Sequence, residues 1–578
     1  MPIYRAEQSR FSFAAESAGG GYFDIITAVT DAAAWTASIN VAAGVPAGSR
    51  SLVFDGGLIG TLSVGDYIQI GTGAVAEIRR ISSLGSYNGT GDAGTVFIDY
   101  PTAFFHDNNE VLDEKTVADI TLNGRSYITF LPGVYETVAV SDMETEITPH
   151  YFLSTSAVRN PTRFYRGKQG FAGSLSDFIL LNGFPIRFPI GRITTVGTDA
   201  AGGGGSTSSA ATRVGDISLP VTDRLNYAVA DLIQIDTGAS AEVRQIITGI
   251  GAGAGTFTLN YPLMIAHSSG AALNEVISPF THTARERNDI DYMTWNLQLR
   301  DSAEAVPLSP GATNPETSFD FMRRYVGGKV NRATLKAEEG EMLRMSWDDV
   351  TFLDMVHNQV TSSVLTITPK SSSALLPPAG IGGAWSSSGV DGVYTNPAFP
   401  TTEPYYFSQG SLTFFGVVLA RIRRFEISIE NNIDPRYYIR SLGSERIPFE
   451  LQEQRRAYRM TATIATEDSL VANSTVRTLF KELMSEGNYT AGFTGLAISM
   501  VFRRGTNDII VITIPPGTAG TIPASETAGV PGTGIDAQSA FILRAPTPIG
   551  TDSPVQVEVD IVFRSMQIEI TDSIGTYP

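Results

Sequence analysis

The side chains best suited to metal or nucleophilic chemistry are spread along this sequence rather than gathered in motifs. The five histidines lie far apart, and no His-Glu-x-x-His or other paired-ligand spacing occurs among them (His106, His150, His267, His282 and His357). The chain has no cysteine, which excludes thiolate nucleophiles, disulfides and cysteine-ligated zinc or iron–sulfur sites. We therefore expect no metal site and no catalytic residue of these kinds.

Two glycine-rich segments match phosphate-binding loops only in part. Gly327-Gly328-Lys329 is followed by Val330, where a Walker A motif has a magnesium-binding Ser or Thr. The alternating glycines of 249–255 lie between two strand-like segments with no helix behind them, so a flexible hairpin turn is favoured over a phosphate loop. No Gly-x-Ser-x-Gly sequence is present. We expect no cofactor.

Neighbouring carboxylates are the remaining candidates for chemistry. Glu338, Glu339 and Glu341 surround Gly340, and Asp348-Asp349 follow shortly after. Paired carboxylates can act as general acid and base on a glycosidic bond. A chain with 59 acidic residues contains such neighbours by composition alone, so a solvated turn is the favoured interpretation and catalysis the alternative.

An internal repeat organises the sequence. Residues 66–81 return almost unchanged at 231–246, and Tyr100-Pro101 and His106 return as Tyr261-Pro262 and His267. We infer two homologous small all-β modules, module 1 (38–112) and module 2 (212–276), each joined to the rest through loops. A Gly/Ser run that starts at 201 is expected to be a flexible linker. The matched histidines indicate either a shared site or, with more support, a repeated structural role.

Length and composition indicate a globular chain with several domains. At 578 residues the chain exceeds what one hydrophobic core can hold, and 42% hydrophobic with 17% charged residues is a normal globular balance. The net charge of −18 disfavours general nucleic-acid binding. No apolar run is long enough to span a bilayer as a helix, and the first ten residues carry charge where a signal peptide is apolar. We assign 1–37, 113–200 and 277–578 to one discontinuous main body.

Period-two alternation of apolar and polar residues predicts a main body made mainly of strands. The apolar residues from Val555 to Phe563 alternate and then change phase before Met566, which predicts a bulge near Arg564-Ser565. One helix is predicted over 473–486, and 371–404 and 515–539 are expected to be long loops. The other predicted strands are Leu343–Asp348, Phe425–Glu430, Tyr458–Ile464 and Leu496–Phe502.

Five segments of the main body together resemble the tail tube proteins of long-tailed phages. They are Arg5–Glu16, Gly170–Leu175, Tyr325–Leu335 with the Glu-rich turn after it, Arg424–Ile433, and Ser444–Phe449. The resemblance implies a β-sandwich with one flanking helix, which contributes strands to an intersubunit β-barrel. It also implies a structural virion protein rather than an enzyme. Copies would form stacked hexameric rings, and these rings would make the hollow tail tube through which genomic DNA is ejected into the host cell.

The same resemblance implies a set of partners. These are other copies of the chain, a tape measure protein inside the tube, and tail terminator and distal tail or baseplate proteins at its ends. DNA would pass without specific binding, since an acidic lumen offers phosphates no partner, and Glu338, Glu339 and Glu341 are the expected channel-facing acids. The modules would lie outside the tube, where they would obstruct a contractile sheath and so favour a long, non-contractile tail. The alternative is a carbohydrate-binding or carbohydrate-cleaving tail or surface protein, with the modules as binding units.

Overall fold

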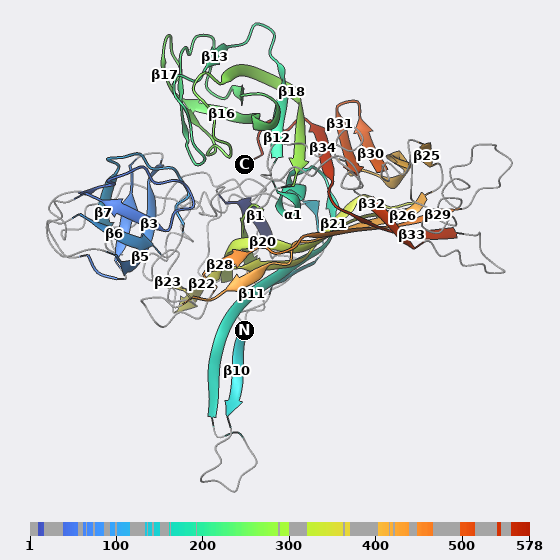
Figure 1. Cartoon of the computed structure of the whole chain (residues 1–578), viewed down its shortest axis with the longest axis horizontal. Coiled ribbons are helices and arrows are strands. Elements are labelled where there is room, and N and C mark those ends of the chain that lie inside the picture. Colours follow the sequence, from blue (N-terminus) through green and yellow to red (C-terminus); the bar gives the residue numbers. More distant parts are fainter. Residues whose placement is uncertain are drawn as a thin grey trace.

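The computed structural model of the chain (Figure 1) is built mainly from antiparallel strands. The residues that it describes are 10–16, 39–55, 62–64, 66–72, 75–85, 93–98, 101–115, 133–135, 137–140, 144–150, 161, 163–191, 193–286, 290–299, 321–361, 364–369, 403–414, 417–419, 422–438, 448–465, 498–514, 540–544 and 556–577. The predicted helix over 473–486 lies outside these residues, as does nearly all of the two predicted long loops. No helix among the described residues is long and apolar enough to cross a membrane.

The larger of the two main sheets, the tube sheet, contains 14 described strands. Its main path runs through β10 (Glu144–His150), β11 (Arg163–Leu180), β21 (Arg344–Phe352), β20 (Phe321–Glu338), β26 (Ile422–Glu430), β29 (Ala457–Ala465), β33 (Gln556–Phe563) and β32 (Ala540–Arg544). The strands off this path are β1 (Arg10–Ala15), β8 (Gly133–Val134), β9 (Thr137–Val140), β19 (Met293–Leu299), β22 (Asp354–Thr361) and β23 (Val364–Pro369).

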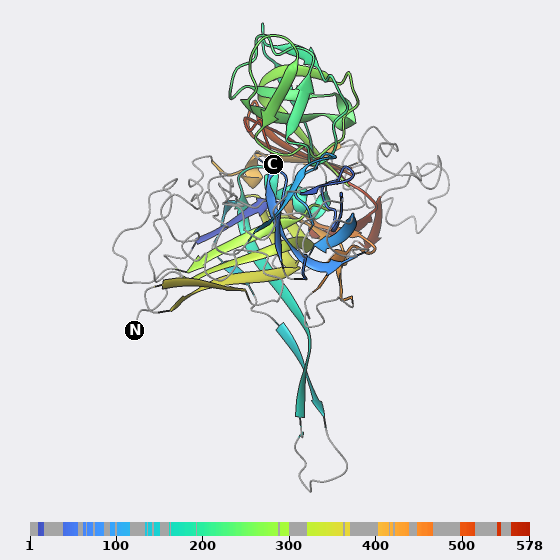
Figure 2. The ribbon, with the colours of Figure 1, turned by 90° about the vertical axis from the view of Figure 1, so that its left-hand side faces the viewer.

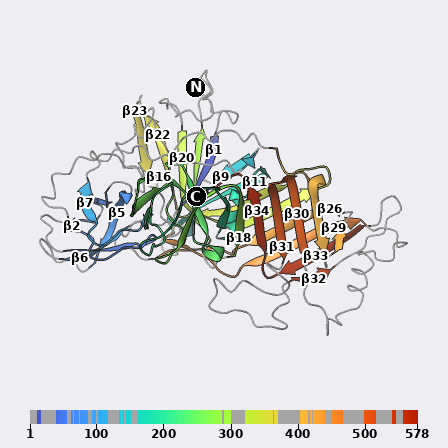
Figure 3. The ribbon, with the colours of Figure 1, turned by 90° about the horizontal axis from the view of Figure 1, so that it is seen from above.

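The second main sheet contains 12 described strands and crosses from module 2 into the main body. Its main path is β14 (Ser218–Val221), β17 (Gly255–Leu259), β16 (Glu242–Thr248), β15 (Leu232–Ile235), β18 (Ala272–Arg285), β34 (Gln567–Asp572), β31 (Asp508–Ile514), β30 (Ile498–Gly505), β24 (Gly410–Phe414) and β25 (Val417–Leu419). β12 (Ile193–Asp199) and β13 (Gly205–Thr207) pair with β18. In Figures 1 and 3, β34, β31 and β30 form a layer over the end of the tube sheet that holds β26, β29 and β33.

An aromatic core joins these two layers into a sandwich. The indole ring of Trp347 packs edge-on against Phe13 and Phe178 and stacks with Trp295, and all four side chains are fully buried. The same apolar cluster includes residues of both main sheets. These four residues all belong to the tube sheet, and Phe425 of β26 packs across the layers on Phe502 of β30, with ring centroids 5.6 Å apart. Buried aromatic contacts of this kind bring a large apolar area and favourable ring geometry, and they hold the two layers together.

Two short helical segments complete this core, and smaller elements lie elsewhere. The 3-10 helix η3 (Phe184–Ile186) leads into α1 (Arg187–Ile190), and both are buried. α1 ends at Gly191, whose φ of 131° is readily adopted only by glycine. The remaining described elements outside module 1 are η4 (Gly238–Ser240), η6 (Phe407–Gln409) and the strand pair β27 (Asp434–Arg436) and β28 (Glu450–Gln452).

The predicted bulge near Arg564-Ser565 is instead a break between two strands. β33 ends at Phe563 in the tube sheet, and β34 begins at Gln567 in the second sheet. The chain crosses between the layers here, so the apolar positions change phase because the buried side of the strand reverses. The other predicted strands are confirmed as β21, β26, β29 and β30, while Gly170–Leu175 lies inside the long strand β11.

The two repeat copies have matching sheets. The strands of module 1 are ordered β2 (Ile39–Asn40), β7 (Val111–Lys115), β4 (Tyr67–Ile70), β5 (Glu77–Leu84), β6 (Gly94–Ile98) and β3 (Ser51–Phe54). In module 2 the corresponding order is β13, β18, β15, β16, β17 and β14. The Gly/Ser run that was expected to be a linker contains β13, and its partner β18 continues without a break into the main body.

Candidate functional site

The tube sheet has one apolar and one polar face along its central strands. On β26, Phe425, Ile427 and Ile429 are buried, while the alternating residues of this strand are exposed or half-buried. Neighbouring strands keep the same phase. The resulting polar face consists of Arg332, Thr334, Lys336 and Glu338 of β20, Arg424, Glu426, Ser428 and Glu430 of β26, Arg459, Thr461 and Thr463 of β29, and Glu558 and Asp560 of β33.

Opposite charges face each other across the strands of this polar face. The register places Arg332 opposite Glu430, Lys336 opposite Glu426 and Glu338 opposite Arg424. Arg424 also forms an ion pair of 2.7 Å with Glu426 on its own strand. Lys336 also pairs with Asp177 at 2.6 Å, and Arg332 lies 3.9 Å from Asp348. Single surface ion pairs stabilise little, but they place a carboxylate beside each of these three basic groups. The polar face is therefore mixed in charge, and its basic groups lie next to acids.

The three predicted acids lie together at one end of this polar face. Glu338 is the last residue of β20, and Glu339 and Glu341 are in the turn to β21, which Gly340 makes with a φ of 83°. Glu339 accepts from Arg423 at 2.9 Å, and Arg344 lies 3.4 Å from Glu341. The structure thus groups these acids, each beside an arginine, at the end of the strands rather than in the middle of the face.

Asp348 and Asp349, the other acidic pair, are engaged by side chains of the adjacent strand. Thr334 donates to Asp348 at 2.6 Å, and Asn331 donates to Asp349 at 2.6 Å. These contacts hold the two carboxylates within the sheet surface. They are not gathered with Glu338, Glu339 and Glu341 around a cleft, and the described residues contain no group of His, Asp and Glu that could hold a metal ion.

A long hairpin formed by β10 and β11 projects from the body of the molecule (Figures 1 and 2). The first half of β11 pairs only with β10 among the described strands, whereas the second half pairs with β21. Apolar side chains on the hairpin are open to solvent: Ile147 is 59% exposed, Phe164 65% and Tyr165 45%. Phe164 and Tyr165 are adjacent in β11 and point to opposite faces, so both faces of the hairpin carry exposed apolar groups. Exposed apolar groups on a thin projection are typical of a segment that a partner covers.

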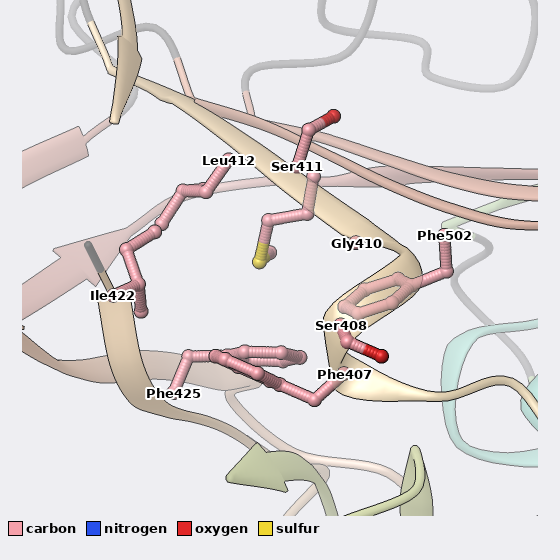
Figure 4. Close-up of a pocket in the computed structure, with 9 residues that line it drawn as sticks. Phe407, Ser408, Gly410, Ser411, Leu412, Ile422, Phe425 and Phe502 are labelled. Atoms are coloured by element: carbon pink, nitrogen blue, oxygen red, sulfur yellow. The ribbon is translucent and has the colours of Figure 1, made fainter. Parts of the chain in front are cut away.

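A pocket of about 190 Å³ opens between the two layers near β24 and β30 (Figure 4). Six of its nine lining residues are apolar, among them Phe407, Phe425 and Phe502, and Ser408, Gly410 and Ser411 complete the lining. No titratable side chain lines it. The pocket can therefore hold a small apolar group, but its walls offer no acid or base for a reaction.

The two glycine-rich segments are engaged by contacts within the protein. Residues 249–255 join β16 to β17, and the Arg224 guanidinium holds this turn by donating to the carbonyl of Gly249 at 2.9 Å. Lys329 is 2% exposed within β20 and forms a 3.0 Å ion pair with Glu453. Its ammonium group is thus used inside the protein.

The matched histidines occupy the same buried network in both modules. In module 2, His267 Nε2 lies 2.7 Å from Glu242, which also accepts from Arg244 at 2.8 Å. In module 1, His106 Nε2 lies 2.5 Å from Glu77, and Arg79 lies 2.5 Å from the same carboxylate. Burial alone would raise the pKa of Glu242, but Arg244 and His267 outweigh it and hold that pKa below its ordinary value.

Sequence reasoning singled out the histidines but missed their Glu and Arg partners. The signal was present, because Glu-x-Arg is retained in both copies while the residue between them changes from Ile78 to Val243. The other histidines have unrelated places. His282 hydrogen-bonds with Thr195 and stacks on Tyr577, His150 packs on Tyr165 in the hairpin, and His357 lies in β22.

Comparison with known proteins agrees with this architecture. The family model described as phage tail tube protein matches residues 186–563, a range that spans module 2 and most of the main body and excludes module 1. No curated protein matches the chain. The sandwich, its polar sheet face and the family match lead to one conclusion: the chain belongs to the phage tail tube protein family, and it is a structural protein of the virion tail.

Proposed function

We propose that copies of this chain assemble into stacked hexameric rings that form the hollow tail tube. The observation that carries this proposal is the projecting hairpin of β10 and β11. It exposes Ile147, Phe164 and Tyr165 far from the aromatic core, and in a lone molecule these side chains remain in water. A second copy that covers them would gain roughly 1.5–3 kcal/mol for each fully buried side chain.

The polar face of the tube sheet supports the second part of the proposal, that genomic DNA passes through the tube during ejection. In a ring whose strands close into a barrel, one face of the sheet lines the channel. The charge-paired face suits this role, because Arg332 and Lys336 lie opposite Glu430 and Glu426, which compete with DNA phosphates. Glu338, Glu339 and Glu341 would lie at one end of such a lining.

The proposed role is structural and not enzymatic, in a long, non-contractile tail. Its partners would be other copies, a tape measure protein inside the tube, and tail terminator and distal tail or baseplate proteins at the ends. Support for a structural role comes from the acids singled out by sequence, since Asp348, Asp349, Glu339 and Glu341 each contact a neighbouring side chain.

Negative-stain electron microscopy of the purified full chain tests the proposal. We expect hollow tubes or stacked rings at concentrations in the micromolar range or above. A monodisperse monomer that releases reducing sugar from a polysaccharide would instead establish the carbohydrate-cleaving alternative. A second test labels native particles with antibodies against this chain. We expect labelling along the tail shaft, and its absence there would contradict the proposal.

A further inference from the structure

The loop that ends each repeat copy, Pro101–His106 in module 1 and Pro262–His267 in module 2, is held from inside by the buried Glu–Arg–His network. The Glu77 carboxylate accepts from the backbone N–H groups of Ala103 and Phe104 at 2.8 and 3.3 Å. Arg79 Nε donates to the Pro101 carbonyl at 2.9 Å. One carboxylate and one guanidinium thus fix both ends of the loop.

The network in module 2 repeats this arrangement at every contact. Glu242 accepts from the N–H groups of Met264 and Ile265 at 3.0 and 3.3 Å, and Arg244 Nε donates to the Pro262 carbonyl at 3.2 Å. The three residues of each network are at most 3% exposed. A buried charged network often stabilises a fold less than apolar residues packed in the same place. The presence of two copies of this network therefore points to a role other than stability.

In module 1 the loop lies against module 2. The Phe105 N–H donates to the Gly215 carbonyl at 3.1 Å, and the Arg213 guanidinium stands 4.3 Å from the centre of the Phe105 ring. Ala103 and Phe104 belong to the same buried apolar cluster as Leu219 and Leu263 of module 2. The loop therefore supplies a backbone hydrogen bond, a cation–π contact and two side chains that complete the core of the other module.

In module 2 the equivalent loop lies against the main body. Arg187 of α1 donates to the sulfur of Met264 at 3.6 Å and forms a 2.5 Å ion pair with Asp291. Arg187 and Asp291 are both buried, at 3% and 2% exposed. The same loop of the repeat thus contacts a neighbouring unit in both modules, although the surfaces it meets differ, and in module 2 the continuous strand β18 also joins the module to the main body.

We propose that this loop is a docking surface whose shape is set by the Glu–Arg–His network, and that its partner is another β-folded unit of the same chain. Module 1 docks on module 2, and module 2 docks on the main body. The two modules then form one ordered outer unit with a defined position, rather than two independent appendages. In this arrangement Glu77, Arg79 and His106 are positioning residues, because they contact the loop and act on module 2 only through it.

Hydrogen–deuterium exchange of the full chain tests this proposal. Phe105→Ala and Arg213→Ala are each expected to speed exchange about tenfold in peptides 101–107 and 212–217. The matched control is Arg224→Ala, which removes a positive charge from module 2 as Arg213→Ala does. In the native chain Arg224 holds the 249–255 turn of module 2 itself. This control variant should leave both peptides unchanged. Unaltered exchange at 212–217 in Phe105→Ala and Arg213→Ala would overturn the docking contact.

A second variant tests the role of the network. Glu77→Gln is expected to speed exchange at 212–217 in module 2, although the hydrogen bonds and ion pairs of Glu77 among the described residues all lie within module 1. Faster exchange confined to peptides of module 1 would show that the network only stabilises its own module, and would overturn its positioning role. If Glu77→Gln unfolds module 1, the milder His106→Gln, which keeps the carboxylate and Arg79, gives the same readout.

Discussion

At the scale of single residues, the carboxylate of Glu242 has the largest predicted effect on stability. It is 3% exposed and accepts from Arg244, His267 and two backbone N–H groups. Glu242→Gln removes the charge that faces a buried guanidinium, so we expect a loss of about 3–5 kcal/mol in the stability of module 2. Hydrogen exchange in β15 and β16 measures this loss.

The control for this prediction is Glu275→Gln in the same module. Glu275 is half-buried and accepts one backbone hydrogen bond, from Gly204 at 2.9 Å. Its replacement should cost about 1 kcal/mol or less, because an amide oxygen can still accept that bond. If the two variants lose the same stability, the network around Glu242 does not make the large contribution to stability that we predict.

Asp216 is predicted to make the contact between the modules sensitive to pH. Burial raises the pKa of Asp216 to about 6, and the charge of Asp107 in module 1 adds to this shift, while Arg213 opposes it. In the docked state Asp216 therefore binds a proton at a pH of about 6, whereas a solvated Asp carboxyl binds one only near its ordinary pKa of 3.8. Docking should strengthen as pH falls through about 6, and the gain should be lost again as pH rises.

Exchange protection at 212–217, compared at pH 7 and pH 5 after correction for intrinsic rates, measures this effect. Protection should be greater at pH 5. Asp216→Asn should abolish the difference, because an amide does not titrate, and should give the stronger protection at both values. A pH response that persists in Asp216→Asn would assign the effect to another group.

At the scale of elements, the hairpin of β10 and β11 is predicted to be needed for assembly and not for folding. Phe164 is 65% exposed, so Phe164→Ser removes little from the folded single chain. If a second copy covers this side chain, the variant should raise the concentration needed for tube formation by about tenfold or more. Sedimentation of assembled material against concentration measures that threshold.

Leu225→Ser is the matched control for the hairpin variant. Leu225 is 55% exposed but lies in module 2, away from the hairpin. Its replacement should leave the assembly threshold unchanged. An unchanged threshold in Phe164→Ser as well would remove the hairpin from the proposed contact between copies.

The elements also show how far the sequence could predict the fold. Alternation identified β21, β26, β29 and β30 because each buries one face of a strand on the same core, and burial is what a period of two records. The phase change before Met566 was visible, but a bulge and a crossing between sheets produce the same local pattern. Only the tertiary pairing of β33 and β34 with different strands separates them.

At β13 the composition does not indicate the structure, for a related reason. Gly205–Thr207 has the glycine and serine content of a linker, yet it pairs with β18, and the pairing partner lies more than sixty residues later in the chain. The polar face was equally hidden, since its charges come from four strands spread over β20 to β33. The three acids that sequence did single out share a turn and so were neighbours in the chain.

At the scale of the whole molecule, the net charge of −18 does not by itself describe the surface that DNA would meet. Arg332, Lys336 and Arg424 lie on the polar face, and each stands opposite or beside a glutamate. Free basic groups in a channel would bind phosphates and slow the passage of DNA. We infer that the pairing of charges, in addition to the total charge, is what keeps this face from holding DNA.

This inference predicts a gain of DNA binding from the loss of two acids. Glu426→Gln with Glu430→Gln removes the acid that pairs with Arg424 and the acid that lies opposite Arg332, so assembled material should retain short double-stranded DNA at low salt. Retention should fall steeply with salt, with a slope of about 0.9 for each phosphate bound. The control is Glu275→Gln with Glu569→Gln, the same change of charge on the other main sheet. If both double variants retain DNA equally, total charge governs the effect and the pairing on the polar face does not, because only the first variant disturbs that face.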